Sequence, residues 1–218
     1  MTASSPSLVH RFVPAADLVG VTLLLLHGTG GNEQDLIPMG QELLPGAALL
    51  SPRGRVLENG VPRFFRRLAE GVFDQEDLRE RTDELGRFVT DATHVYRIVG
   101  DRVIAVGYSN GANIAASLLF RHPRLLSGAV LFRPMVPFHP HPTPDLKGLP
   151  VFLAAGRRDP IVSAEQTSAL AEILQDAGAS ISIHWHPGGH ELGRDDTASA
   201  RHWLAQWWNS AGTSRCRL

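Results

Sequence analysis

Residues 103–119 place the tightest constraint on the fold of this chain. They read VIAVGYSNGANIAASLL, so an apolar run rich in β-branched residues leads through Gly-Tyr-Ser-Asn-Gly into a segment with a helical pattern. A G-x-S-x-G pattern between a strand and a helix is typical of a nucleophile elbow, a turn that strains the serine backbone. The flanking residues are glycines because a Cβ would collide with the adjacent strand and helix. The pattern predicts Ser109 at a helix N-terminus, where the helix dipole favours developing negative charge.

Alternating strand and helix patterns predict the rest of the fold. Short apolar runs predict buried strands, and residues 8–13 predict an additional edge strand; the runs are 21–26, 47–50, 103–106, 129–132, 151–155 and 181–185. Helices are predicted over 163–177, with Ser163 as N-cap, over 195–209, and along the stripe of Leu78, Leu85, Phe88, Ala92, Val95 and Val99. This alternation indicates a doubly wound, mostly parallel sheet in a three-layer αβα arrangement, with its chemistry at the carboxyl ends of the strands.

Length and composition exclude several classes of protein. The 218 residues suit one domain over 21–210, preceded by an extension with an edge strand over 1–20 and followed by a polar tail over 211–218. A net charge of −1 argues against nucleic-acid binding, and no apolar run is long enough for membrane insertion. The single cysteine, Cys216, excludes an internal disulfide framework and a cysteine-based zinc site. Together with the polar N-terminus, it predicts a cytoplasmic protein.

A serine nucleophile needs a base and an acid that orients the base. Asp159 follows the predicted strand 151–155, and His190 lies in a glycine-rich loop after the strand 181–185. The order Ser, Asp, His along the chain fits a nucleophile elbow. Asp159 could instead serve only as a turn residue or helix cap, and His186 is the main rival to His190. The other candidates are expected to have structural roles: Asp145 in a loop, Asp195 and Asp196 capping the last helix, and His184 packed within a strand.

The loop after the first buried strand predicts an oxyanion hole. It reads His-Gly-Thr-Gly-Gly-Asn over 27–32, and its glycines allow main-chain amides to approach a substrate. The predicted donors are the amides of Thr29 and of Asn110, the residue after the nucleophile. A phosphate-binding loop is the alternative, but the pattern matches neither common phosphate-binding motif. His27 is expected to be a structural hydrogen-bonding residue.

Four segments together resemble the phospholipase/carboxylesterase family of α/β-hydrolases. They are LLHGTGGNE at 25–33, GYSNGA at 107–112, AGRRDP at 155–160 and GGHEL at 188–192. The segment 53–71, with LENG and RFFRR, is similar to small bacterial carboxylesterases whose relatives include hydrolases induced under hydroquinone stress. The resemblance implies an α/β-hydrolase fold, hydrolysis of carboxylic esters by a Ser109–His190–Asp159 triad without a metal or organic cofactor, and a possible homodimer.

Two segments are candidates for choosing the substrate. Residues 53–73 follow a predicted strand, so they emerge at the catalytic edge, where Phe64 and Phe65 are expected to wall the pocket. Arg66 and its neighbours Arg53, Arg63 and Arg67 could attract a carboxylate on the substrate. The alternative is a solvated basic loop with both phenylalanines packed beneath it. Residues 134–150, rich in proline and histidine, predict a stiff surface loop that leaves no room for a cap domain.

The sequence therefore predicts a serine carboxylesterase that acts on small esters through an acyl-enzyme. Three alternatives remain open at this stage. A thioesterase or lysophospholipase would use the same residues, and a cofactor-free perhydrolase would accept peroxide in place of water. A non-catalytic sensor of small molecules would keep only the fold.

Overall fold

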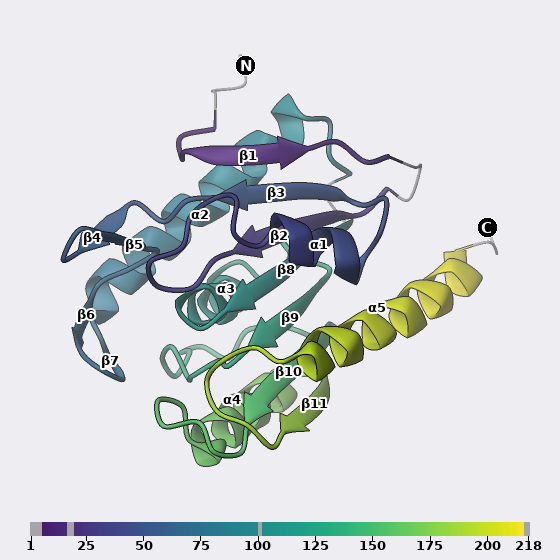
Figure 1. Cartoon of the computed structure of the whole chain (residues 1–218). Helices are drawn as coiled ribbons and strands as arrows, with labels where there is room; N and C mark the ends of the chain where they lie inside the picture. Colours follow the sequence, from purple (N-terminus) through teal and green to yellow (C-terminus); the bar gives the residue numbers. More distant parts are fainter. Residues whose placement is uncertain (1–5, 17–19, 100–101, 216–218) are drawn as a thin grey trace.

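A central sheet with helices on both faces organises the computed structural model, which describes residues 6–16, 20–99 and 102–215 (Figure 1). Six neighbouring strands of the seven-stranded sheet are parallel, and only the edge strand β1 is antiparallel. The strand order is β1 (His10–Val13), β3 (Ala48–Pro52), β2 (Thr22–Leu26), β8 (Val103–Tyr108), β9 (Gly128–Phe132), β10 (Pro150–Gly156) and β11 (Ser180–His186). The structure thus confirms the predicted α/β-hydrolase type of fold.

The helices form two layers, and each layer covers a separate apolar core. Helices α1 (Ile37–Leu43) and α5 (Arg194–Arg215) cover one face of the sheet (Figure 1). Helices α2 (Gln75–Val95), α3 (Asn110–Arg121) and α4 (Ala164–Asp176) cover the other. Alternate residues of a strand face opposite sides, so the buried leucines of β2 divide between the two cores. Apolar runs covered on both faces explain why these strands read as continuous rather than alternating patterns.

Two helices test the patterns read from the sequence. The Ser163 hydroxyl accepts a hydrogen bond from the Gln166 amide, so the predicted N-cap of α4 is confirmed. The apolar stripe of α2 is buried only as far as Ala92. Val95 and Val99 are 43% and 48% exposed; the helix ends at Val95, and beyond it Tyr96 and Ile98 pack against the core instead. The prediction that they continue the stripe was therefore wrong.

The segment 53–73 forms two hairpins instead of an irregular loop. Strand β4 (Val56–Glu58) pairs with β5 (Val61–Arg63), and β6 (Arg67–Ala69) pairs with β7 (Val72–Phe73). Asn59 and Gly60 join the first pair with positive φ angles of 52° and 83°. An Asn-Gly pair with both φ angles positive suits a two-residue hairpin turn, and this was a readable signal in the sequence. Both hairpins lie beyond the carboxyl ends of the strands (Figure 1).

The order in which successive strands join the sheet changes direction between β2 and β8. From β2 the chain passes through α1 to β3 on one side, and through α2 it later reaches β8 on the other side. The loop after β2 leads to α1 on one face, whereas the loop after β8 leads to α3 on the opposite face. A crevice opens at such a switch point, at the carboxyl ends of the strands.

The ends of the chain and the loop over 134–150 complete the fold. The predicted edge strand is present as β1, whereas α5 continues to Arg215, beyond the expected boundary at residue 210. Cys216 and the rest of the predicted tail lie outside the described residues. Residues 134–149 contain no helix or strand, in agreement with the predicted surface loop. Over the ranges that the structure describes, no helix is both long and apolar enough to cross a membrane.

Candidate active site

Ser109 lies between β8 and α3 in a strained backbone conformation. Its φ of 51° and ψ of −112° are unusual for a residue with a side chain. The turn is tight because a Cβ on Gly107 would lie 2.5 Å from the Gly111 carbonyl oxygen. A Cβ on Gly111 would lie 2.0 Å from the Leu26 carbonyl oxygen. Both distances are far below van der Waals contact, so the two glycines of the motif permit the elbow predicted from the sequence.

A continuous chain of hydrogen bonds links the three residues predicted to act together. The Ser109 Oγ and His190 Nε2 atoms are 2.9 Å apart, and His190 Nδ1 lies 2.8 Å from Asp159 Oδ2. A carboxylate only accepts, so the neutral imidazole donates its Nδ1 proton to Asp159 and leaves Nε2 free to accept from the hydroxyl. The structure brings the three side chains together from the ends of β8, β10 and β11.

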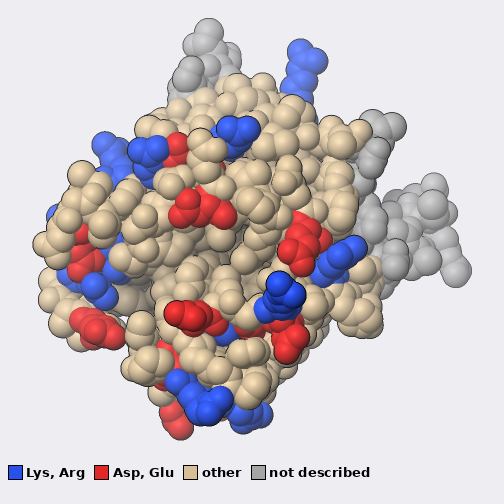
Figure 2. Space-filling model, viewed as in Figure 1, with Lys and Arg blue, Asp and Glu red and all other residues tan. Residues whose placement is uncertain are grey.

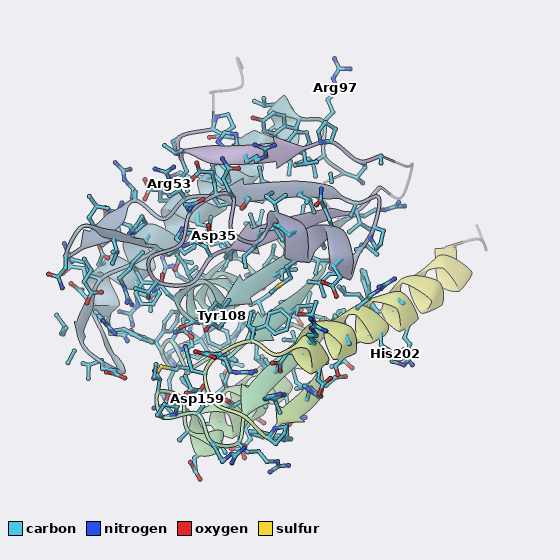
Figure 3. The ribbon with its side chains drawn as sticks, in the orientation of Figure 1. Asp35, Arg53, Arg97, Tyr108, Asp159 and His202 are labelled. Atoms are coloured by element: carbon cyan, nitrogen blue, oxygen red, sulfur yellow. The ribbon has the colours of Figure 1, made fainter. Side chains whose placement is uncertain are left out.

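The carboxylate of Asp159 is fixed on both of its oxygens. Oδ1 accepts hydrogen bonds from the amides of Ile161 and Val162, at 2.8 and 3.0 Å, while Oδ2 faces His190. The side chain is fully buried. Figure 3 labels Asp159 in the turn after β10 and Tyr108 at the end of β8. Asp159 is thus both a turn residue and the partner of the histidine, two roles that the sequence offered as alternatives.

The loop that carries His190 packs closely against the end of β10. The amide of Arg158 donates to the Gly188 carbonyl, and a Cβ on Gly156 would lie 2.3 Å from the Gly189 carbonyl oxygen. The Tyr108 hydroxyl donates to the carbonyl of His190 itself at 3.1 Å. Burial raises the pKa of this hydroxyl above its usual range, so Tyr108 remains a donor.

The loop after β2 brings Thr29 to the same cavity as Asn110. As the first residue of α3, Asn110 has an amide without an intrahelical partner. The Thr29 hydroxyl accepts a hydrogen bond at 2.8 Å from the buried guanidinium of Arg63. Arg63 also donates to the Phe65 carbonyl and pairs with Glu58 at 3.1 Å. The first hairpin therefore anchors the loop that was predicted to supply an oxyanion donor.

His27 has the structural role expected of it. Its ring accepts a hydrogen bond from the Gly54 amide at Nε2, so Nδ1 carries the proton and donates to the Gly28 carbonyl. Burial lowers the pKa of His27, which outweighs the opposite effects of its hydrogen bond to Gly28 and of Asp35 and Glu33. The residue is neutral and joins the loop after β2 to the segment after β3.

A cavity of about 220 Å³ opens at Ser109. Its lining comes from the segments that follow the parallel strands, from the start of α3 and from the two hairpins. It comprises Thr29, Arg63, Arg67, Glu70, Gly71, Phe73, Tyr108, Ser109, Asn110, Asn113, Met135, Ile161 and His190. Figure 2 shows the molecule in space-filling form, in the orientation of Figure 1, with acidic and basic side chains intermingled over the visible face. The cavity suits a small ligand rather than a long one.

The three residues predicted to bind substrate lie outside this lining. Phe64 is buried against the His27 ring, and Phe65 is buried against Phe73. Arg66 points outward, where it hydrogen-bonds Asp74 at 3.1 Å. The prediction placed them at the wall because they follow a catalytic-edge strand. Residues 64–66 instead connect the two hairpins, and both phenylalanines pack inward there, so Arg63, Arg67 and Phe73 of the hairpin strands line the cavity.

The rival residues lie elsewhere. His186 accepts from the Gly188 amide at 2.9 Å, and His184 stacks on Phe152 within the sheet. Asp195 is exposed in the first turn of α5. Asp196 accepts from the Gly193 amide, as a capping residue would, but it also forms a buried ion pair with Arg133. No signal in the sequence pointed to Arg133, because its partners come from distant segments.

Comparisons with known proteins agree with this architecture. The family model described as "Dienelactone hydrolase family" matches residues 62–207. The chain belongs to the dienelactone hydrolase family. This family member is 54% identical over 184 residues to the putative hydrolase MhqD of Bacillus subtilis, covering 84% of this chain and 92% of that protein. It is a hydrolase with a carboxylesterase-like α/β-hydrolase fold.

Two solved structures are similar to this dienelactone hydrolase family member over most of their length. The carboxylesterase of Bacillus cereus has a TM-score of 0.90 and 48% identity, covering 92% of this chain and 94% of that one. A structure of YahD with malic acid has a TM-score of 0.87 and 31% identity, covering 91% and 98%. The similarity therefore extends over most of the fold.

Proposed function

We propose that this family member is a serine carboxylesterase that hydrolyses small carboxylic esters through an acyl-enzyme. The observation that carries the proposal is the hydrogen-bonded series from Ser109 through His190 to Asp159 at the mouth of a small cavity. Nucleophile, base and orienting acid in hydrogen-bond reach are the arrangement that acyl transfer by serine requires.

The first half of the proposed reaction forms the acyl-enzyme. Ser109 Oγ attacks the ester carbonyl carbon while its proton passes to His190 Nε2. Asp159 accepts the Nδ1 hydrogen bond, holds the ring in this tautomer and stabilises the imidazolium that results. The tetrahedral intermediate collapses, the bond to the leaving oxygen breaks, and the alkoxide takes the proton from Nε2.

The second half repeats these steps with water. A water molecule gives a proton to His190 Nε2 as its oxygen attacks the acyl carbon, and Ser109 leaves with that proton when the second intermediate collapses. We propose that the amides of Thr29 and Asn110 stabilise both oxyanions. Removing a single donor of this kind costs about 2.7–4 kcal/mol of barrier in a measured case. The proposed steps draw only on these residues and water.

The cavity favours small, uncharged esters. Each arginine of the segment 53–73 that was a candidate for binding a carboxylate has an acidic partner of its own chain. Arg63 and Arg67 share Glu58, Arg66 pairs with Asp74, and Arg53 pairs with Glu33. Glu70 also lines the cavity. Because these charges balance, we propose that size rather than charge selects the substrate. Because the YahD structure contains malic acid, an ester that bears a carboxylate is the substrate to compare with an uncharged ester.

Two further properties belong to the same proposal. We infer a cytoplasmic enzyme, since a chain of 218 residues with one cysteine is typical of a reducing compartment. We also propose a single catalytic domain over residues 21–210. A homodimer, which the family resemblance suggests, is tested by light scattering of the purified protein.

The decisive experiment compares the wild-type protein with Ser109→Ala. Wild-type protein is expected to hydrolyse p-nitrophenyl acetate and to react with a fluorophosphonate probe, whereas the folded variant is expected to do neither. Full labelling of the variant would overturn the assignment of the nucleophile. A panel of ethyl butyrate, monoethyl succinate, a long-chain ester and a long-chain thioester then tests the substrate. Preference for the long-chain thioester would favour the thioesterase alternative.

A further inference from the structure

Arg133 is a buried charged residue for which the proposed reaction has no use. It follows β9 directly, has a left-handed backbone φ of 56°, and donates its amide to the Ala154 carbonyl at 2.7 Å. Its side chain is fully buried. Burial of a guanidinium and a left-handed backbone each cost free energy. The contacts of Arg133 with the surrounding structure therefore have to offset both costs.

The guanidinium holds the backbone on either side of His190. Nε donates to the Gly189 carbonyl at 3.0 Å, and Nη2 donates to the Glu191 carbonyl at 2.8 Å. Gly189 and Glu191 are the residues immediately before and after the histidine. Two bonds from one rigid, planar group to these carbonyls restrict both translation and rotation of the intervening residue.

Asp196 fixes the guanidinium from the opposite side. Its two oxygens accept from Nη1 and Nη2 of Arg133 at 3.0 and 2.7 Å, and one of them also accepts from the Gly193 amide. Burial alone would raise the pKa of this carboxyl. The hydrogen bonds from Arg133 and Gly193, with the charge of Arg133, bring it below its usual range. The pair anchors the His190 loop to the first turn of α5.

The same strand end also holds the nucleophile. The amide of Ser109 donates to the carbonyl of Phe132 at 2.9 Å, and Phe132 immediately precedes Arg133. Two consecutive residues at the end of β9 thus hold both groups: Phe132 fixes Ser109, and Arg133 fixes the loop of His190. Without such contacts, the glycines around His190 would leave its position loosely defined.

We propose that Arg133, held by Asp196, is a positioning residue that sets the distance between His190 and Ser109. The inference rests on the proposed serine esterase function. A buried ion pair adds little net stability compared with an apolar pair, which leaves placement of the loop as its principal effect. Catalytic groups must be held within about 0.5 Å, and a displacement of about 1 Å can cost 10²-fold in rate.

The test uses Arg133→Lys, with Asp196→Asn as a second variant and Arg121→Lys as the matched control. Lysine keeps the charge but cannot reach both carbonyls and Asp196 together. Arg121 forms a similar two-point pair with Asp83, at 2.6 and 2.8 Å, between α3 and α2 and away from the cavity. Each protein is assayed with p-nitrophenyl acetate well below its unfolding midpoint. The rate of fluorophosphonate labelling is measured alongside.

Arg133→Lys is expected to lower kcat by about 10- to 100-fold with KM within about twofold, and to slow labelling of Ser109 by the same factor. Asp196→Asn is expected to give a smaller loss of the same kind, and Arg121→Lys none. If Arg133→Lys loses only thermal stability and keeps its kcat, the proposal is overturned. If that variant does not fold, an unchanged kcat in Asp196→Asn overturns it equally. Wild-type protein without esterase activity or labelling would instead refute the proposed function.

Discussion

Asp159 shows how one side chain can satisfy two demands. Its Oδ1 caps the turn after β10 through the amides of Ile161 and Val162, and its Oδ2 accepts from His190. The turn therefore aims the carboxylate at the imidazole without relying on a flexible rotamer. The sequence located Asp159 correctly because it follows a strand, but it could not show that both oxygens are used.

Asp159→Asn is expected to lower kcat by about 10⁴-fold, by analogy with the measured effect of this substitution in a serine protease. The amide can donate to Nδ1 and so stabilise the tautomer in which Nε2 carries the proton and cannot accept from Ser109. Steady-state hydrolysis of p-nitrophenyl acetate measures the effect. Asp195→Asn, at an exposed position in the first turn of α5, serves as the control. If Asp195→Asn loses activity and Asp159→Asn keeps it, the assignment of Asp159 as the orienting acid is wrong.

Arg63→Gln is expected to lower kcat/KM by about tenfold, a fraction of the 10²–10³ that a whole oxyanion donor contributes. The substitution removes the charged donor that holds the Thr29 hydroxyl, so the loop loses its anchor to the first hairpin. Arg66→Gln is the matched control, because Arg66 belongs to the same segment but points to solvent and Asp74. Equal losses in both variants would contradict a role for Arg63 in placing the loop.

The elbow between β8 and α3 depends on close approach between elements. Helix α3 enters against the end of β2, where the Leu26 carbonyl occupies the space that a side chain on Gly111 would need. This contact places Ser109 and the loop after β2 on opposite sides of one crevice. The motif was visible in the sequence, but the element against which it packs was not.

Gly111→Ala is expected to destabilise the protein by about 3 kcal/mol or more, because its Cβ would meet backbone that cannot move away. Urea unfolding or the yield of soluble protein measures this. Gly86→Ala, inside α2, is the control. There the nearest atoms to a new Cβ belong to the partly exposed His122 side chain, at 3.1 Å, rather than to backbone, and alanine is the better helix former by about 1 kcal/mol. Comparable stability of the two variants would refute the close-approach argument.

The hairpins over 56–73 are the elements that were not predicted from the sequence. Strands of two or three residues carry too few positions for a periodic pattern, although Asn59-Gly60 marked one turn. The hairpin strands place Arg63 and Phe73 at the cavity, whereas Phe64 and Phe65, in the connection between the hairpins, are buried beneath it. The long buried strands were predictable because continuous apolar runs are unambiguous when the intervening segments are helical.

For the molecule as a whole, burial of ionisable groups couples folding to pH. His27 is 1% exposed between the loops after β2 and β3, and burial lowers its pKa from 6.5. As the pH falls below about 6.5, the unfolded chain binds a proton at this residue before the folded chain does. The contribution of His27 is therefore complete above that pH and declines toward the lower pKa of the folded state.

His27→Gln is expected to make this decline disappear. The wild-type free energy of unfolding, relative to that of the variant, should fall between pH 7.5 and 5 by about 1.4 kcal/mol for each unit of pKa lowering. Urea titrations of both proteins across this range measure the difference and cancel the effects of other groups. A difference that stays constant with pH would contradict the neutral, buried state of His27.

The sequence by itself determined the parallel sheet, the elbow at Ser109 and the order of the three hydrogen-bonded residues. Those features are local, because apolar runs, a strand–turn–helix motif and the ends of strands are each readable in a short window. Only the tertiary structure decided which side chains line the cavity and what holds His190 in place. Arg133 meets its loop across more than fifty residues, since Gly189 lies 56 positions further along the chain. Contacts of that separation depend on the packing of β9, the His190 loop and α5, which no local pattern encodes.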